Sequence, residues 1–134
     1  MGRRGDCRLY RYRKGMVKQM TRDHSTVSEM ARLRLISAGD ASRHPNRHQL
    51  TRALGADPFT RPDTFRDKTT PGDSYLICSD GLWSEVTPKD VEDGLSDNDI
   101  TIGFEELIGK VLDAGAHDNV TGVLFRIIWC LFIL

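Results

Sequence analysis

The chain has 134 residues, of which 39% are hydrophobic and 28% are charged, a composition typical of one globular domain. Its longest unbroken apolar run, residues 127–134, is far shorter than the roughly 20 residues that a membrane-spanning helix needs. The three cysteines are scattered without CxxC spacing. This argues against a disulfide framework or a cysteine zinc site and favours a reducing cytoplasm.

The 19 basic and 19 acidic residues cancel overall but are unevenly distributed. Residues 1–56 hold 13 Lys and Arg against 4 Asp and Glu, whereas residues 57–134 hold 6 against 15. One interpretation is a basic surface for an anionic partner beside an acidic site for cations. The other is that the two halves neutralise each other across a packed interface, and charge alone favours this one.

The first third of the chain predicts a hairpin followed by a helix. Residues 6–13 carry Cys, Leu and two Tyr among charged residues, and residues 16–20 continue with Met and Val after the turn signal Lys14-Gly15, which predicts a β-hairpin. Thr26 and Glu29 form a capping box, and apolar residues recur every three positions behind it. With Gly39 at the position that follows a helix, this pattern predicts a helix of about three turns.

Residues 40–68 contain several proline turns and are predicted to be irregular. The apolar run 74–79 predicts a buried strand that ends at Asp80-Gly81. Thr87 and Pro88 are typical of a helix start.

The last part of the chain predicts one helix and one strand. An amphipathic helix is expected where apolar residues follow helical spacing and Gly115 closes the segment; these residues are Phe104, Leu107, Ile108, Val111 and Leu112. Residues 120–125 predict a final strand. Helices and strands mix without regular alternation, which favours an α+β domain.

Two acidic residues lie at predicted strand ends beside turn residues. Asp80 precedes Gly81, and Asp118 precedes Asn119. A carboxylate at the end of a buried strand is held rigidly, and Mg²⁺ and Mn²⁺ prefer such oxygen ligands. Each signal is weak when taken alone, because Asp-Gly and Asp-Asn are also common in ordinary turns.

Five short segments strengthen this interpretation because they occur together and in a distinctive order. They are GDCRLY at 5–10, TRDHS at 21–25, LTRALG at 50–55, SDGLW at 79–83 and DNVT at 118–121. The series resembles the C-terminal half of a bacterial metal-dependent serine/threonine protein phosphatase of the PPM type, also called type 2C.

The resemblance implies an α+β fold: a partial α-β-β-α sandwich of two antiparallel sheets flanked by helices, with the N-terminal half missing. Residues 1–126 would form this partial phosphatase domain, within which 24–50 match a flap beside the active site. Residues 127–134 form an apolar tail that lies beyond the family pattern and has no assigned role.

The resemblance also implies a metal site. Asp80 and Asp118 match two carboxylates of a binuclear Mn²⁺ or Mg²⁺ centre, and Asp6 matches a residue that joins Asp80 at a third, weaker ion. The basic flap residues would either contact a phosphoprotein or form a solvated loop; they are Arg43, His44, Arg47 and His48.

The implied reaction is attack on phosphoserine or phosphothreonine by a water that the metal ions activate, without a protein nucleophile. The substrate would be a phosphorylated protein, and the enzyme would oppose a serine/threonine kinase in the cytoplasm.

The sequence departs from the family because it lacks the N-terminal half, which supplies further metal ligands and a phosphate-binding arginine. We therefore expect weakened metal binding, little activity from this chain alone, and self-association through exposed sheet edges. One alternative is a non-catalytic phosphoprotein-binding or regulatory remnant. A less favoured one is a nucleic-acid binder that uses the basic N-terminal half, since no stacking aromatic pattern, helix-turn-helix or zinc motif accompanies the arginines.

Overall fold

The computed structural model describes residues 2–3, 6–23, 25, 27, 30–31, 33–37, 40 and 63–128. The chain divides into two compact units. The first unit comprises Met1–Asp6 and Arg22–Arg66, and the second comprises Cys7–Thr21 and Asp67–Leu134. Within the described residues, no helix combines the length and apolar character that a membrane span requires.

In the first unit, β1 (Gly2–Arg3) pairs with β4 (Asp63–Thr64) in antiparallel fashion. The helix that was predicted to run to Gly39 ends earlier. Arg34 adopts a φ of 57°, and its N–H donates to Ala31 O at 3.1 Å, while the N–H of Leu35 donates to Met30 O at 2.9 Å. These two bonds form a Schellman motif, so Arg34 takes the left-handed position that the sequence assigned to Gly39. The predicted capping box lies outside the described residues.

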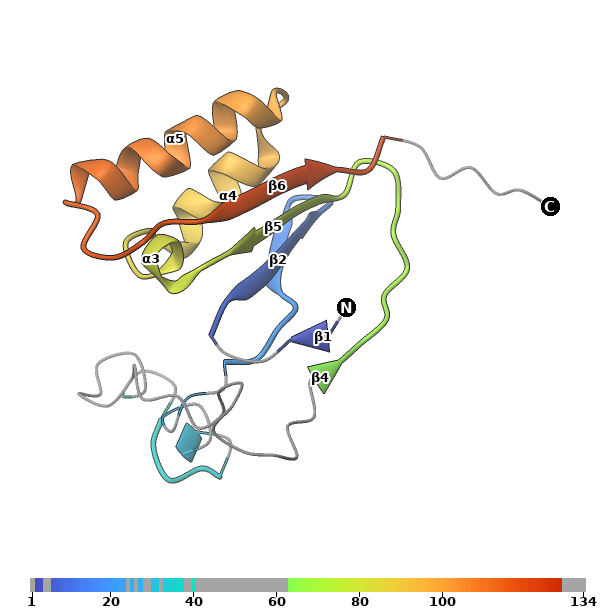
Figure 1. Cartoon of the computed structure of the whole chain (residues 1–134). Coiled ribbons are helices and arrows are strands. Elements are labelled where there is room, and N and C mark those ends of the chain that lie inside the picture. The colour runs from blue at the N-terminus through green and yellow to red at the C-terminus, as the bar shows by residue number, and fades with distance from the viewer. Residues whose placement is uncertain are drawn as a thin grey trace. The chain divides into compact units, whose positions relative to one another are not determined.

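The second unit contains an antiparallel sheet of four strands in the order β3-β2-β5-β6, of which Figure 1 labels β2, β5 and β6. Their bounds are β2 Arg8–Arg13, β3 Met16–Gln19, β5 Ser74–Cys78 and β6 Gly122–Arg126. Lys14 and Gly15 join β2 to β3 with φ angles of 50° and 80°, as expected for the two-residue turn that matches strand twist. The predicted hairpin is confirmed.

Three helices follow in the same unit: α3 (Asp80–Trp83), α4 (Pro88–Ser96) and α5 (Ile100–Asp113). Thr87 caps α4 in a reciprocal capping box with Asp90, so the predicted helix start is confirmed. The last helix begins before the apolar pattern at Phe104, because the Asp99 side chain accepts from the Thr101 N–H and supplies an earlier cap. The single turn α3 was not predicted, since Asp80-Gly81 was interpreted only as the end of a strand.

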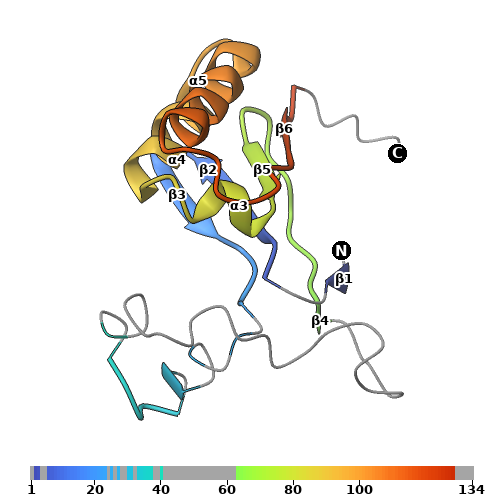
Figure 2. The same cartoon turned by 60° about the vertical axis from the view of Figure 1, so that its left-hand side comes forward.

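The hydrophobic core lies between the sheet and the helices, which cover one face of it (Figure 2). Its fully buried members come from β5 and all three helices; they are Leu76, Cys78, Leu82, Val91, Leu95, Leu107 and Val111. Burying each leucine contributes about 1.5–3 kcal/mol relative to an exposed position. The core therefore fixes β5, and with it the residues that follow β5.

The opposite face of the sheet carries apolar side chains with less cover. Val123 is 55% exposed and Phe125 is 39% exposed, although the Phe125 ring stacks on Tyr75 with centroids 5.3 Å apart. The second unit thus has a sheet with helices on one side, which agrees with the predicted α+β fold and with half of the predicted sandwich. Backbone pairing also extends past Arg126, because Ile127 N–H donates to Asp73 O at 2.8 Å.

An ion pair between a partly exposed arginine and a buried aspartate holds the segment before β5 against β2. The Arg13 guanidinium donates to both carboxylate oxygens of Asp73, with distances of 2.7 and 2.6 Å. The same carboxylate accepts from the Thr70 N–H at 2.8 Å and from the Tyr75 hydroxyl at 3.3 Å. Because the Asp73 side chain is only 2% exposed, its charge depends on these donors for compensation.

We expect Asp73→Asn to lower the free energy of unfolding by about 3 kcal/mol, because it leaves the Arg13 charge without its carboxylate. Urea unfolding at pH 7 measures this loss. The bonds from Arg13 hold the pKa of Asp73 below its ordinary value of 3.8. A lowered carboxyl pKa stabilises the fold above the unfolded pKa, and this stability is lost as pH falls below it. The wild type should therefore lose more stability than Asp73→Asn between pH 5 and pH 3, and equal losses would contradict the assignment.

Helices α4 and α5 approach each other closely at two glycines. A Cβ atom on Gly103 would lie 2.2 Å from the carbonyl oxygen of Gly94, and one on Gly94 would lie 2.7 Å from the side chain of Leu107. Neither position has room for a side chain, so this crossing requires glycine on both helices.

We expect Gly103→Ala to destabilise the protein by about 1–3 kcal/mol through overpacking. Gly109→Ala is a matched control on the same helix, because nothing lies within 4 Å of its added Cβ. The control should be neutral or stabilise by up to about 1 kcal/mol, since alanine is the better helix former. Thermal unfolding of both variants tests the contact, and equal effects would show that the crossing is not tightly packed.

Candidate metal-binding loops

Asp80 and Asp118 flank two neighbouring strands of the sheet. Asp80 begins α3, two residues after β5 ends, and Asp118 lies in the loop that leads into β6. Because β5 and β6 are antiparallel, with Cys78 opposite Gly122, the end of one strand lies beside the start of the other. The two aspartate-bearing loops therefore meet at the same end of the sheet.

Direct contacts join these loops. Ser79 N–H donates to Thr121 O at 2.9 Å, and the Ser79 hydroxyl accepts from Thr121 N–H at 3.0 Å and donates to Asn119 O at 3.2 Å. On the other side of Asp80, a Cβ atom on Gly81 would lie only 2.5 Å from the Asn119 carbonyl oxygen. Both residues that flank Asp80 thus contact the loop that follows Asp118.

Each aspartate is also oriented by its own loop. Asp80 Oδ1 accepts from the Gly81 N–H at 3.1 Å, and Asp118 Oδ1 accepts from the Asn119 N–H at 2.7 Å. Asp80 is partly buried, whereas Asp118 is exposed. These bonds limit the rotation of both carboxylates without using all of their oxygen lone pairs.

The donor chemistry suits a hard divalent cation, since both groups are carboxylates. The number of donors is small, because the described residues contain no cluster of three or more His, Cys, Asp or Glu side chains suited to an ion. Mg²⁺ is commonly held by one or two protein carboxylates together with water and phosphate oxygens. The two carboxylates therefore suit part of the ligand set of a metal centre, and a binuclear centre needs further ligands from elsewhere.

The remaining predicted site residues are not joined to this pair by the structure. Asp6 belongs to the first unit, whereas Asp80 and Asp118 belong to the second, so the third-ion site stays a prediction. The four basic flap residues lie outside the described residues; they are Arg43, His44, Arg47 and His48.

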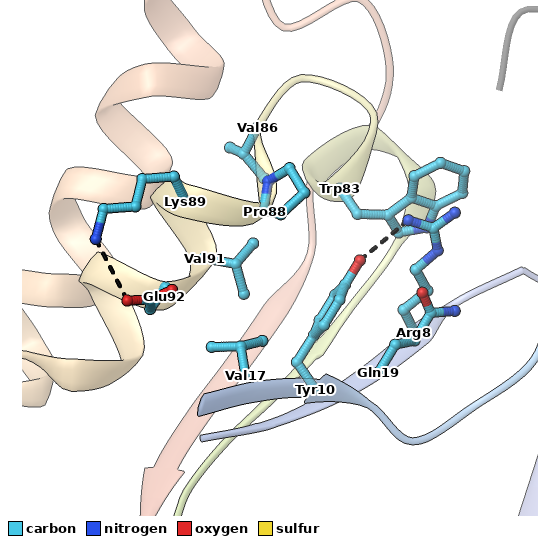
Figure 3. Close-up of a pocket in the computed structure, with 10 residues that line it drawn as sticks. All are labelled: Arg8, Tyr10, Val17, Gln19, Trp83, Val86, Pro88, Lys89, Val91 and Glu92. Carbon is cyan, nitrogen blue, oxygen red and sulfur yellow. Dashed lines mark hydrogen bonds and ion pairs between the residues drawn. The ribbon is translucent and has the colours of Figure 1, made fainter. Parts of the chain in front are cut away.

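A separate pocket of about 430 Å³ opens between the β2–β3 hairpin and the helices (Figure 3). The Arg8 guanidinium lies 3.4 Å over the ring of Trp83 and donates to the Tyr10 hydroxyl at 3.0 Å. At the other end, Lys89 and Glu92 on α4 form an ion pair at 3.3 Å. Neither aspartate is among the residues that line it. The pocket is therefore distinct from the carboxylate pair.

Sequence analysis missed the residues that join the two loops. Ser79 contacts residues some forty positions away, and Gly81 contacts Asn119, so no local pattern points to either role. The sequence singles out both residues only as members of the SDGLW segment at 79–83, which assigns neither of them a role.

Comparison with known proteins identifies relatives along most of the chain. No protein-family profile matches it. The serine/threonine phosphatase Stp of Listeria welshimeri is 37% identical over 121 residues, which is 90% of this chain and 48% of the relative. The chain thus spans about half the length of this curated relative.

Solved structures give the same result. The PPM serine/threonine phosphatase MsPP of Mycobacterium smegmatis, solved with cacodylate, matches with a TM-score of 0.82 and 40% identity. The match covers 92% of this chain and 53% of that one. The catalytic domain of the phosphatase PstP, solved with two manganese ions, matches with a TM-score of 0.80 and 29% identity over 93% of this chain and 51% of that one.

The five sequence motifs, the α+β fold and these matches agree. The chain is similar, over about nine-tenths of its length, to one half of a bacterial PPM-type serine/threonine protein phosphatase.

Proposed function

We propose that this chain supplies the C-terminal half of a metal-dependent phosphatase that removes phosphate from phosphoserine and phosphothreonine in proteins. The observation that carries the proposal is the junction of the Asp80 and Asp118 loops at one end of the sheet. The relatives named as serine/threonine phosphatases support the substrate class. The order of the five motifs supports the C-terminal half.

In this proposal Asp80 and Asp118 share Mn²⁺ or Mg²⁺ with ligands from the other half, and Asp6 joins Asp80 at a third ion. The related PstP structure with two manganese ions supports a binuclear centre. Bound ions would lower the pKa of a water and stabilise negative charge on the phosphoryl oxygens.

The residues of this chain orient the two carboxylates that would hold the ions. Two carboxylates on adjoining loops repel a phosphate dianion, so substrate can approach them only after cations have neutralised their charge. The Gly81 N–H donates to one oxygen of Asp80, and the Asn119 N–H donates to one oxygen of Asp118. Each bond fixes the orientation of its carboxylate and therefore the direction of the second oxygen. The pair thus acts as a cation-dependent phosphate site rather than as a source of a nucleophile.

The proposal extends to partners and location. The substrates are phosphorylated proteins, which the phosphatase dephosphorylates in opposition to a serine/threonine kinase during signalling in the cytoplasm. The basic flap residues either contact these substrates or form a solvated loop. The scattered cysteines, which lack CxxC spacing, support a reducing compartment.

A chimera tests the activity. The half of the Listeria welshimeri phosphatase that this chain does not match is joined ahead of residue 1, and hydrolysis of a phosphothreonine peptide is followed with Mn²⁺ and with a chelator. We expect Mn²⁺-dependent turnover by the chimera and none by the chain alone. Asp80→Asn or Asp118→Asn in the chimera should lower kcat/KM by at least about a hundredfold, because each removes a charged ligand.

Asp113→Asn is the matched control, since Asp113 is an exposed carboxylate at the end of α5. Turnover that survives in Asp80→Asn would contradict the proposal. Phosphopeptide binding without turnover would also contradict it and would identify a non-catalytic remnant. Salt-sensitive RNA binding as the main activity would contradict it as well. Mn²⁺-dependent turnover by the chain alone would show that two carboxylates suffice.

A further inference from the structure

Ser79 occupies an unusual position between β5 and α3. It is the residue before the first turn of α3, where a serine ordinarily caps the helix with its hydroxyl. Here the side chain makes no capping bond. Its hydroxyl instead accepts from Thr121 N–H at 3.0 Å and donates to Asn119 O at 3.2 Å. The side chain is thus committed to the neighbouring loop rather than to its own helix.

These bonds act together with a backbone bond and a close contact. Ser79 N–H donates to Thr121 O at 2.9 Å, so one residue makes three hydrogen bonds to the segment after Asp118. Gly81 leaves no space on the other side of Asp80, because an added Cβ would lie 2.5 Å from Asn119 O. The hydrogen bonds of Ser79 hold the two loops together, and the absence of a side chain on Gly81 lets their backbones approach closely.

We propose that Ser79 is a positioning residue that sets the separation between the Asp80 and Asp118 loops before any cation binds. Asp80 lies between Ser79 and Gly81, so the contacts of these two neighbours set the position of its backbone. Asp118 directly precedes Asn119, whose carbonyl oxygen accepts a hydrogen bond from the Ser79 hydroxyl. The role in metal binding rests on the proposed function, whereas the coupling of the loops does not.

The test uses the ¹⁵N-labelled full chain and the backbone amide signals of Gly81 and Asn119. In the metal-free spectrum, Ser79→Ala should shift both signals, because the loops lose their hydroxyl link. In a MnCl₂ titration, paramagnetic broadening of both signals should require about ten times more Mn²⁺ than in the wild type. This is the lower end of the cost for losing a group that supports a metal ligand, because Ser79 bonds to the backbone after Asp118 and not to either carboxylate.

Two further variants separate positioning from a general structural effect. Ser79→Thr keeps the hydroxyl and should restore both the chemical shifts and the Mn²⁺ midpoint. Ser96→Ala removes a comparable hydroxyl, bonded to Asp93 O at 3.0 Å on α4, and should change neither.

The outcomes are distinct. Wild-type shifts and a wild-type Mn²⁺ midpoint in Ser79→Ala would overturn the proposal, and so would failure of Ser79→Thr to restore them. If Mn²⁺ broadens neither signal in the wild type, the two loops do not hold the ion without ligands from the other half, and the metal-binding part of this inference fails for the chain alone. The metal-free shifts in Ser79→Ala would then still decide whether Ser79 couples the loops.

Discussion

The antiparallel pairing of β5 with β6 is the constraint on which the candidate site depends. Forty residues separate Ser79 from Asn119 in sequence, yet pairing of Cys78 with Gly122 brings the end of one strand beside the start of the other. A parallel pair would place these aspartate loops at opposite ends of the sheet. The hydrophobic core then fixes β5 in place, because Leu76 and Cys78 are buried beneath the helices. The burial of these side chains on one face of the sheet therefore fixes the positions of the two loops at its end.

The same architecture explains why the chain resembles half of an enzyme. One face of the sheet is covered by α4 and α5, whereas Val123 and Phe125 on the other face keep substantial exposure. The carboxylate pair is similarly partial, because Asp80 and Asp118 offer the donor type that a divalent cation prefers, but the described residues hold no cluster of three or more such side chains. Related structures of about twice this length, one of which holds two manganese ions, agree with a shared site.

Local signals in the sequence were sufficient for several elements. Lys14-Gly15 predicted the hairpin turn because few residues adopt its backbone conformation, and Thr87-Pro88 predicted the start of α4 because capping acts within one turn. The helix expected to reach Gly39 was wrong because Arg34 adopts the left-handed conformation five residues earlier, which residue preferences do not predict. Asp80 and Asp118 were predicted as metal ligands from turn chemistry and motif order, and the structure shows that their two loops adjoin. The roles of Ser79 and Gly81 were not predicted, because their contacts exist only after β5 and β6 have paired.

The central claim is that pairing of two strands creates half of a metal centre from Asp80 and Asp118. The most direct measurement is an anomalous-scattering map from crystals of the full chain grown with MnCl₂. We expect a manganese peak bonded to carboxylate oxygens of both aspartates, with Ser79 still bonded to the Asn119 and Thr121 backbone. Manganese bound only elsewhere, or no peak at these two carboxylates, would contradict it.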